Sequence, residues 1–312
     1  MTVFRKSLSA DDALRLRARL LSLFVRTFGR YFGDRLCVAD HFQIQCVQRS
    51  ETRLVLDKLC STLATYFIQS SIPWSHAVFE VLGSLHGEAP ISAGDIPDIA
   101  TYASKFVNEL SPTKLYLLLV FCRILAEDIE TTDSLSPQHR HLEGLLKEDI
   151  SVVTDLVRCG LGPSATSDIY REALGTFQTW TGYAHSHWSR DSTAIQHLQS
   201  LSEPIMQLLV SDDLYLRDST MEVFTQLLDY HFKFLRKDQV EVLANLIRTV
   251  LVPQCLNELR TEEPDPSVAT IGRLVAAFAK ATVQRIVEAP TEATSMSLTG
   301  KLHAPYTVRT HE

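Results

Sequence analysis

The chain contains 312 residues, 45% of them hydrophobic, and carries a formal net charge of −7. That charge argues against direct binding of nucleic acid, and the low counts of glycine and proline, 12 each, favour long helices over many short strands. The longest apolar run, residues 115–122, is far too short to cross a bilayer, so the sequence predicts no membrane insertion.

The first predicted helix covers residues 10–30. Ser9 can cap its N-terminus, and Asp11 and Asp12 suit the helix dipole in the first turn. No partner helix precedes it, so residues 1–30 are interpreted as the orphan helix of a truncated repeat. Residues 31–50 mix aromatic residues, cysteines and glutamines without a period, and we expect an inserted loop. Our hypothesis is that this insert is translated non-coding sequence in a partial gene product.

From Glu51 onward the pattern is a helix, a polar turn and a second helix, repeated five times. The predicted helix pairs are residues 51–71 and 74–85, 99–110 and 112–129, 139–159 and 164–184, 194–210 and 215–232, and 239–259 and 268–287. Pro112 fits the first position of its helix, whereas Pro253 lies inside a predicted helix and should kink it. Residues 290–312 have no apolar face and are expected to form a disordered tail.

Successive pairs begin roughly 40 to 55 residues apart, which is the repeat length of HEAT-like arrays. One such pair is too small to bury its own apolar face and needs neighbours. The sequence therefore predicts an all-α fold, a HEAT/ARM-type α-α superhelical solenoid of about five helix pairs over residues 51–289. Within it, Leu174, Phe177 and Trp180 share one helix face and are predicted to be core.

Acidic residues gather at predicted helix ends and turns, as in the run from Glu127 to Glu130. The plainer interpretation is a solvated helix end. The alternative is contact with basic segments of partner proteins, because the inner face of a solenoid concentrates such charges. The candidate cargo-binding acidic residues are Glu127, Asp128, Asp212, Asp213, Glu262 and Glu263.

Other polar patterns do not predict a chemical site. The pairs His139/His141 and His185/His187 lack further metal ligands and are interpreted as solvated surface histidines. The run Gly160-Leu-Gly162 has no preceding strand and no following GK[ST], so it predicts a helix–helix turn. We therefore expect no catalytic residue, metal or cofactor and no enzyme activity. The rival view is a helical enzyme with an unrecognised site.

Six cysteines without CxxC spacing, and no apolar signal segment in residues 1–12, indicate reduced thiols inside the cell. Cys60 and Cys122 lie in apolar helical stretches and are predicted to pack as small apolar residues.

Four segments, in the same order and separation, resemble the importin-β (karyopherin-β) family, in particular its transportin-SR/importin-13-like branch. They are RLVLDKLC at residues 53–60 with Pro73-Trp74, ALGTFQTW at residues 173–180, LYLRDSTMEVF at residues 214–224 with Leu227 and Leu228, and IGRLV at residues 271–275. The resemblance covers residues 51–287.

The resemblance implies a nuclear transport receptor that moves between nucleus and cytoplasm. It would bind protein cargo, such as arginine-serine-rich proteins, on its inner face and phenylalanine-glycine (FG) repeats of the nuclear pore between outer helices. Family members are several times longer and bind Ran-GTP mainly through N-terminal repeats, which this chain does not match, so no Ran-contacting residue carries over. The alternative function is a generic HEAT-repeat scaffold for a protein complex.

Overall fold

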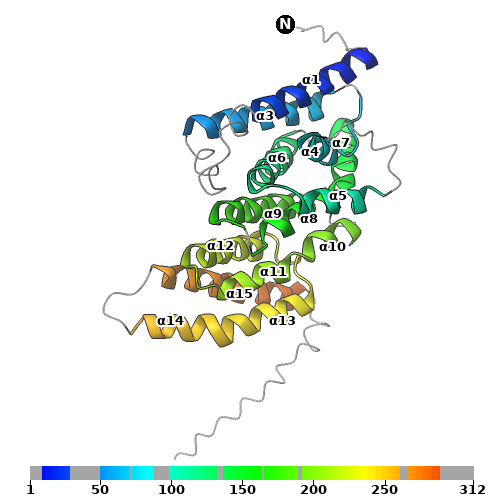
Figure 1. Cartoon of the computed structure of the whole chain (residues 1–312). Helices are drawn as coiled ribbons and strands as arrows, with labels where there is room; N and C mark the ends of the chain where they lie inside the picture. Colours follow the sequence, from blue (N-terminus) through cyan, green and yellow to red (C-terminus); the bar gives the residue numbers. More distant parts are fainter. Residues whose placement is uncertain are drawn as a thin grey trace, which may run out of the picture.

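The computed structural model describes residues 9–28, 50–70, 72–87, 98–132, 136–163, 165–188, 192–260 and 266–288. Every regular element in these ranges is helical, which confirms the predicted all-α class. The α-helices in Figure 1 are α1 (Ala10–Phe28), α3 (Ser50–Gln69), α4 (Ala77–His86), α5 (Ile99–Asn108), α6 (Pro112–Glu130), α7 (Pro137–Glu148), α8 (Ile150–Gly160), α9 (Ser167–His187), α10 (Ser192–Gln199), α11 (Ser202–Gln207), α12 (Leu214–Tyr230), α13 (Lys237–Leu246), α14 (Val252–Glu258) and α15 (Ser267–Glu288).

The helices pack mainly against helices near them in the chain and form two rows (Figure 1). In one row α3, α6, α9, α12 and α15 lie side by side in that order. In the other row the order is α4, α5, α8, α10, α11 and α13. Because α6 also contacts α4 and α8, and α9 contacts α8 and α10, the two rows enclose the apolar side chains between them.

Neighbouring helices of the first row run in the same direction. The Thr176 hydroxyl and the Trp180 indole of α9 donate hydrogen bonds to the carbonyl oxygens of Leu119 and Cys122 in α6. The later residue of α9 contacts the later residue of α6, so the two helices are parallel. Helices α9, α12 and α15 are parallel for the same reason. Their cross-helix contacts are Arg171–Tyr215, Gln178–Gln226, Asp229–Lys280 and Phe232–Arg285. Equivalent ends of these helices therefore lie at the same edge of the row.

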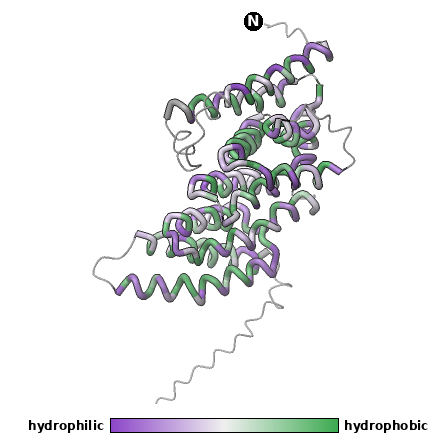
Figure 2. Tube along the Cα trace, in the orientation of Figure 1, coloured by the Kyte–Doolittle hydropathy of each residue, from purple (hydrophilic) through white to green (hydrophobic). Residues whose placement is uncertain are grey.

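Helix α6 forms the centre of the core. Residues 115–122 are each at most 5% exposed, because α3, α4, α8 and α9 all pack against this helix. A helix surrounded in this way needs apolar residues on every side, and Figure 2 shows them concentrated there. The predicted core stripe Leu174, Phe177 and Trp180 is buried, and Cys60 and Cys122 are buried as expected.

The prediction of single helices over residues 139–159 and 194–210 is wrong. The first is divided into α7 and α8 at Asp149, whose carboxylate accepts a hydrogen bond from the Val78 N–H of α4. The second is divided into α10, α11 and a 3₁₀ turn, Leu208–Val210. Pro204 has no N–H to donate and its ring would clash with the preceding turn, so a helix from residue 192 cannot continue through it.

Two other predicted helices differ in their details. Residues 239–259 form α13, a π-helical turn (Ile247–Leu251) and α14 without a break, and the π-helical turn lies just before Pro253, which has no N–H to donate to the preceding turn. Helix α4 begins at Ala77 rather than Trp74. The indole of Trp74 is instead buried and donates to Glu80 over 2.8 Å. Ser111 and Pro112 start α6 as predicted.

Several predictions fall outside the described residues. These are residues 29–49, which hold most of the predicted insert, the predicted tail at residues 290–312, and the turn with Glu262 and Glu263. Ser50, assigned to the insert, begins α3. Among the described helices none combines the length and the apolar character that a membrane span requires.

Candidate functional site

A surface cavity of about 270 Å³, lined by both polar and apolar side chains, lies on the first row, between α6, α9 and α12. It lies beside the C-terminal halves of these parallel helices, so three negative helix-dipole ends are at the same edge. The lining residues are Glu127, Glu130, Gln178, Thr179, Thr181, Gly182, Ser186, Val223, Gln226, Leu227, Tyr230 and His231.

Two glutamates give this cavity its acidic side. Glu127 and Glu130 come from the last turn of α6. Glu127 is held by an ion pair of 2.9 Å with Arg123, and Glu130 is exposed. On the other side Gln178 of α9 donates a hydrogen bond to Gln226 of α12, which fixes the two amides in the cavity wall.

His231 in the cavity wall and the neighbouring His185 do not offset this charge. The rings of His185 and His231 lie 4.8 Å apart between centroids. Burial lowers the pKa of both side chains, assisted by Lys233 at His185 and by His185 at His231. Both imidazoles are therefore expected to be neutral at pH 7, so they add no positive charge beside Glu130 and the Glu127–Arg123 ion pair.

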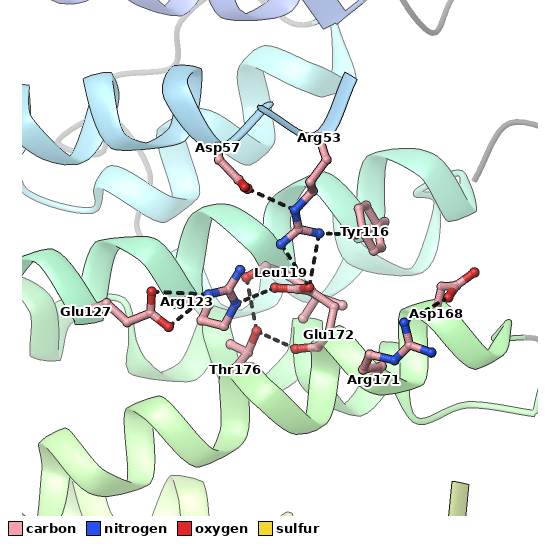
Figure 3. A network of polar contacts seen from close by, with 10 residues as sticks. All are labelled: Arg53, Asp57, Tyr116, Leu119, Arg123, Glu127, Asp168, Arg171, Glu172 and Thr176. Carbon is pink, nitrogen blue, oxygen red and sulfur yellow. Dashed lines mark hydrogen bonds and ion pairs between the residues drawn. The ribbon is translucent and has the colours of Figure 1, made fainter. Parts of the chain in front are cut away.

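A network of polar contacts beside the cavity fixes the position of Glu127 (Figure 3). At its centre is Glu172 of α9, whose side chain is only 9% exposed. Its carboxylate lies 2.6 Å from Arg123 of α6 and 3.4 Å from Arg53 of α3, so one acid joins three helices of the row. Arg53 also pairs with Asp57 at 3.0 Å.

Arg123 connects this network to the cavity. Burial opposes its charge, but the carboxylates of Glu172 and then Glu127 more than compensate and raise the pKa of the guanidinium. Arg123 therefore stays charged and holds Glu127 in one orientation. The Thr176 hydroxyl adds a hydrogen bond across the same interface, to the carbonyl oxygen of Leu119.

The acidic residues predicted from the sequence do not form one cluster. Glu127 lines the cavity, whereas Asp128, whose pKa is raised by burial and by Glu127, does not. Asp212 is exposed in the turn before α12, and Asp213 caps that helix by accepting a hydrogen bond from the Leu216 N–H over 3.1 Å. Because α6 and α12 run in parallel, Asp213 lies toward the opposite edge of the row from Glu127.

The interpretation of His139 as a surface histidine is wrong. Its ring is 1% exposed, and its Nδ1 lies 2.7 Å from the Thr132 hydroxyl. The ring also packs 4.8 Å from that of His187, between centroids. The burial was not predicted, because His139 lies in the first turn of α7, and only the packing of that turn against the core shows which way its side chain faces. The predicted turn at Gly160-Leu-Gly162 is confirmed, since α8 ends at Gly160.

Sequence reasoning missed most of the cavity wall. Gln178 comes from α9, whereas Gln226, Tyr230 and His231 come from α12 and its C-cap, more than 25 residues further along the chain. Single polar residues of this kind give no signal in the sequence. The cavity wall could have been predicted from the register of the helices, because parallel packing of α9 and α12 places their C-terminal halves next to each other.

The lining of the cavity suits a cationic side chain better than an anionic one. Two carboxylates, amide oxygens and three helix C-termini favour a guanidinium or an ammonium group. The described residues contain no group of three or more His, Cys, Asp or Glu side chains that could hold a metal ion.

Comparison with known proteins found no family model, no curated protein and no solved structure that matches this chain.

Proposed function

We propose that the two rows form a HEAT/ARM-type solenoid that binds basic segments of partner proteins, as part of a nuclear transport receptor of the importin-β type. The observation that carries the proposal is the acidic cavity between α6, α9 and α12. The proposed role in transport rests on the resemblance of residues 51–287 to that family. The proposed localisation, in nucleus and cytoplasm, follows from that role.

The arrangement of the rows supports the proposal. Parallel helices that lie side by side leave one face of each exposed along the row, and such a face can bind an extended chain over several repeats. Arg123 orients Glu127 but also offsets part of its charge, so the exposed Glu130 supplies the main attraction for a cation and Glu127 a second, pre-oriented acceptor.

The binding part is tested with a fluorescein-labelled peptide of alternating arginine and serine, measured by fluorescence anisotropy. The double variant Glu127→Gln/Glu130→Gln should weaken binding by about fivefold to tenfold, since two charged contacts are lost. The matched control is Glu203→Gln/Glu241→Gln, which removes the same charge from exposed positions of α11 and α13. Equal binding by the two double variants would contradict the assignment of this cavity.

The transport part is tested with immobilised phenylalanine-glycine repeats and with Ran bound to a non-hydrolysable GTP analogue. Retention on the repeats supports a transport receptor. Binding of the basic peptide without binding to either transport partner would favour the alternative, a scaffold for a protein complex.

A further inference from the structure

Helix α1 is fixed against the rest of the molecule in one orientation. The hydroxyl of Tyr66 in α3 donates a hydrogen bond to the carbonyl oxygen of Ala13 over 2.6 Å. Arg17 lies 3.6 Å from Glu80 of α4, with its guanidinium carbon 5.8 Å from the ring centroid of Trp74. Contacts on two sides prevent α1 from rotating about its axis, so its outer face is defined.

That outer face combines leucines and arginines. Leu16 and Leu23 are 37% and 53% exposed, and Arg15, Arg19 and Arg26 are exposed beside them. At 3.6 residues per turn these five positions fall within one arc of about 100°. Figure 2 shows polar and apolar residues interleaved along this helix. The buried face, with Leu21 and Phe24, lies opposite.

The charge on this face is not balanced within the described part of the chain. No ion pair joins Arg15, Arg19 or Arg26 to another described residue, in contrast to Arg17. Asp12, exposed at the N-terminal end of the same face, accepts a hydrogen bond from the Ser9 hydroxyl, so three arginines face one acid there. The outer face of α1 is therefore basic and partly apolar, although the net charge of the whole protein is −7.

We propose that the outer face of α1 is a docking surface for an acidic amphipathic helix of a partner protein. Leu16 and Leu23 lie seven residues apart, about 10 Å along the axis, which is the spacing of apolar contacts between two packed helices. The arginines beside them match glutamates or aspartates that flank the apolar stripe of such a helix. The face is too narrow and lacks the aromatic residues that would favour insertion into a lipid surface.

The probe is a fluorescein-labelled peptide of about 20 residues with leucines at helical spacing and glutamates on both flanks. Fluorescence anisotropy should show binding that weakens with salt. Arg19→Glu/Arg26→Glu should reduce the affinity by at least about tenfold, and Leu16→Ser/Leu23→Ser by about fivefold. Arg273→Glu, which changes an exposed arginine of α15, is the matched control and should bind as the unmodified protein does.

Further measurements separate this surface from its alternatives. A peptide with lysine in place of glutamate should not bind, and Glu127→Gln/Glu130→Gln should leave binding of the acidic peptide unchanged, because that cavity is a separate site. The proposal is overturned if the α1 variants bind the acidic peptide as tightly as the control. It is also overturned if the peptide fails to bind while the protein sediments with phosphatidylserine vesicles, or forms dimers that the α1 substitutions abolish.

Discussion

Asp149 joins two elements that are far apart in the sequence. It is fully buried at the junction of α7 and α8, and its carboxylate accepts hydrogen bonds from the N–H groups of Val78 and Phe79, the latter longer at 3.4 Å. These are the second and third residues of α4, whose own N-cap, His76, is in the left-handed region with φ 54° and offers no side-chain bond. Asp149 thus supplies the cap that α4 lacks.

Replacing Asp149 with alanine should lower the free energy of unfolding by about 2–4 kcal/mol, because two buried N–H groups lose their acceptor. Asp149→Asn keeps one acceptor and the shape of the side chain, so a smaller loss is expected. Urea denaturation followed by circular dichroism measures both changes. An alanine variant as stable as the asparagine variant would show that the cap contributes little.

The same residue predicts a pH dependence. Burial raises the pKa of Asp149 to about 7, against the opposing effect of its two hydrogen bonds. Because the folded-state pKa lies above the unfolded one, its contribution to stability is complete below about pH 4 and is lost as pH rises through 7. The stability of the wild-type chain relative to Asp149→Asn should therefore fall by a few kcal/mol, on the order of 3, between these limits. Urea unfolding of both proteins at pH 4.5 and 7.5 tests this, and a constant difference would contradict it.

At the scale of elements, the end of α8 lies very close to the first row. A Cβ added to Gly160 would lie 2.9 Å from the Cβ of Ala173 in α9 and 3.1 Å from a methyl carbon of Leu119 in α6. Neither neighbour can yield easily, since Ala173 has no flexible side chain and Leu119 is fully buried. Glycine here allows α8 to pack directly against α9.

Gly160→Ala should therefore destabilise the protein by about 1–3 kcal/mol, although alanine is the better helix former by about 1 kcal/mol. Gly144→Ala in α7 is the matched control, because nothing lies within 4 Å of an added Cβ there. That change should stabilise the fold by about 0.5–1 kcal/mol. Thermal unfolding of both variants measures the sign, and a stabilising Gly160→Ala would refute the close packing.

Element by element, the sequence predicts the helices better than their ends. Amphipathic periodicity locates the long helices α3, α6, α9, α12 and α15, because their apolar faces repeat over many turns. It misses the break at Asp149. This residue ends α7 and caps α4, a helix more than 60 residues away. Likewise, Glu172 carries no local signal, since its partners Arg53 and Arg123 lie in other helices. Long-range contacts of this kind are absent from any local pattern.

Over the whole molecule, the two-row arrangement predicts how stability is distributed. Where helices pack mainly against their neighbours, the stability of each depends on how many neighbours it has. Helix α6 has four, α3, α4, α8 and α9, whereas α1 has α3 and α4, and α15 has α12 and α14. Several exposed apolar residues lie in α3 and α15, such as Leu54 at 62% and Val287 at 71%, although the most exposed, Tyr230 at 74%, belongs to α12.

Native-state hydrogen exchange followed by mass spectrometry should therefore show a gradient along the rows. Amides of α6 and α9 should exchange slowest, and those of α1, α13 and α14 should exchange first, because the ends can open without disturbing the centre. The acidic cavity would then lie among slowly exchanging helices, because α12 is held between α9 and α15. Uniform protection in all these helices would mean that the molecule unfolds as one cooperative unit, and the idea of an array built from neighbour contacts would fail.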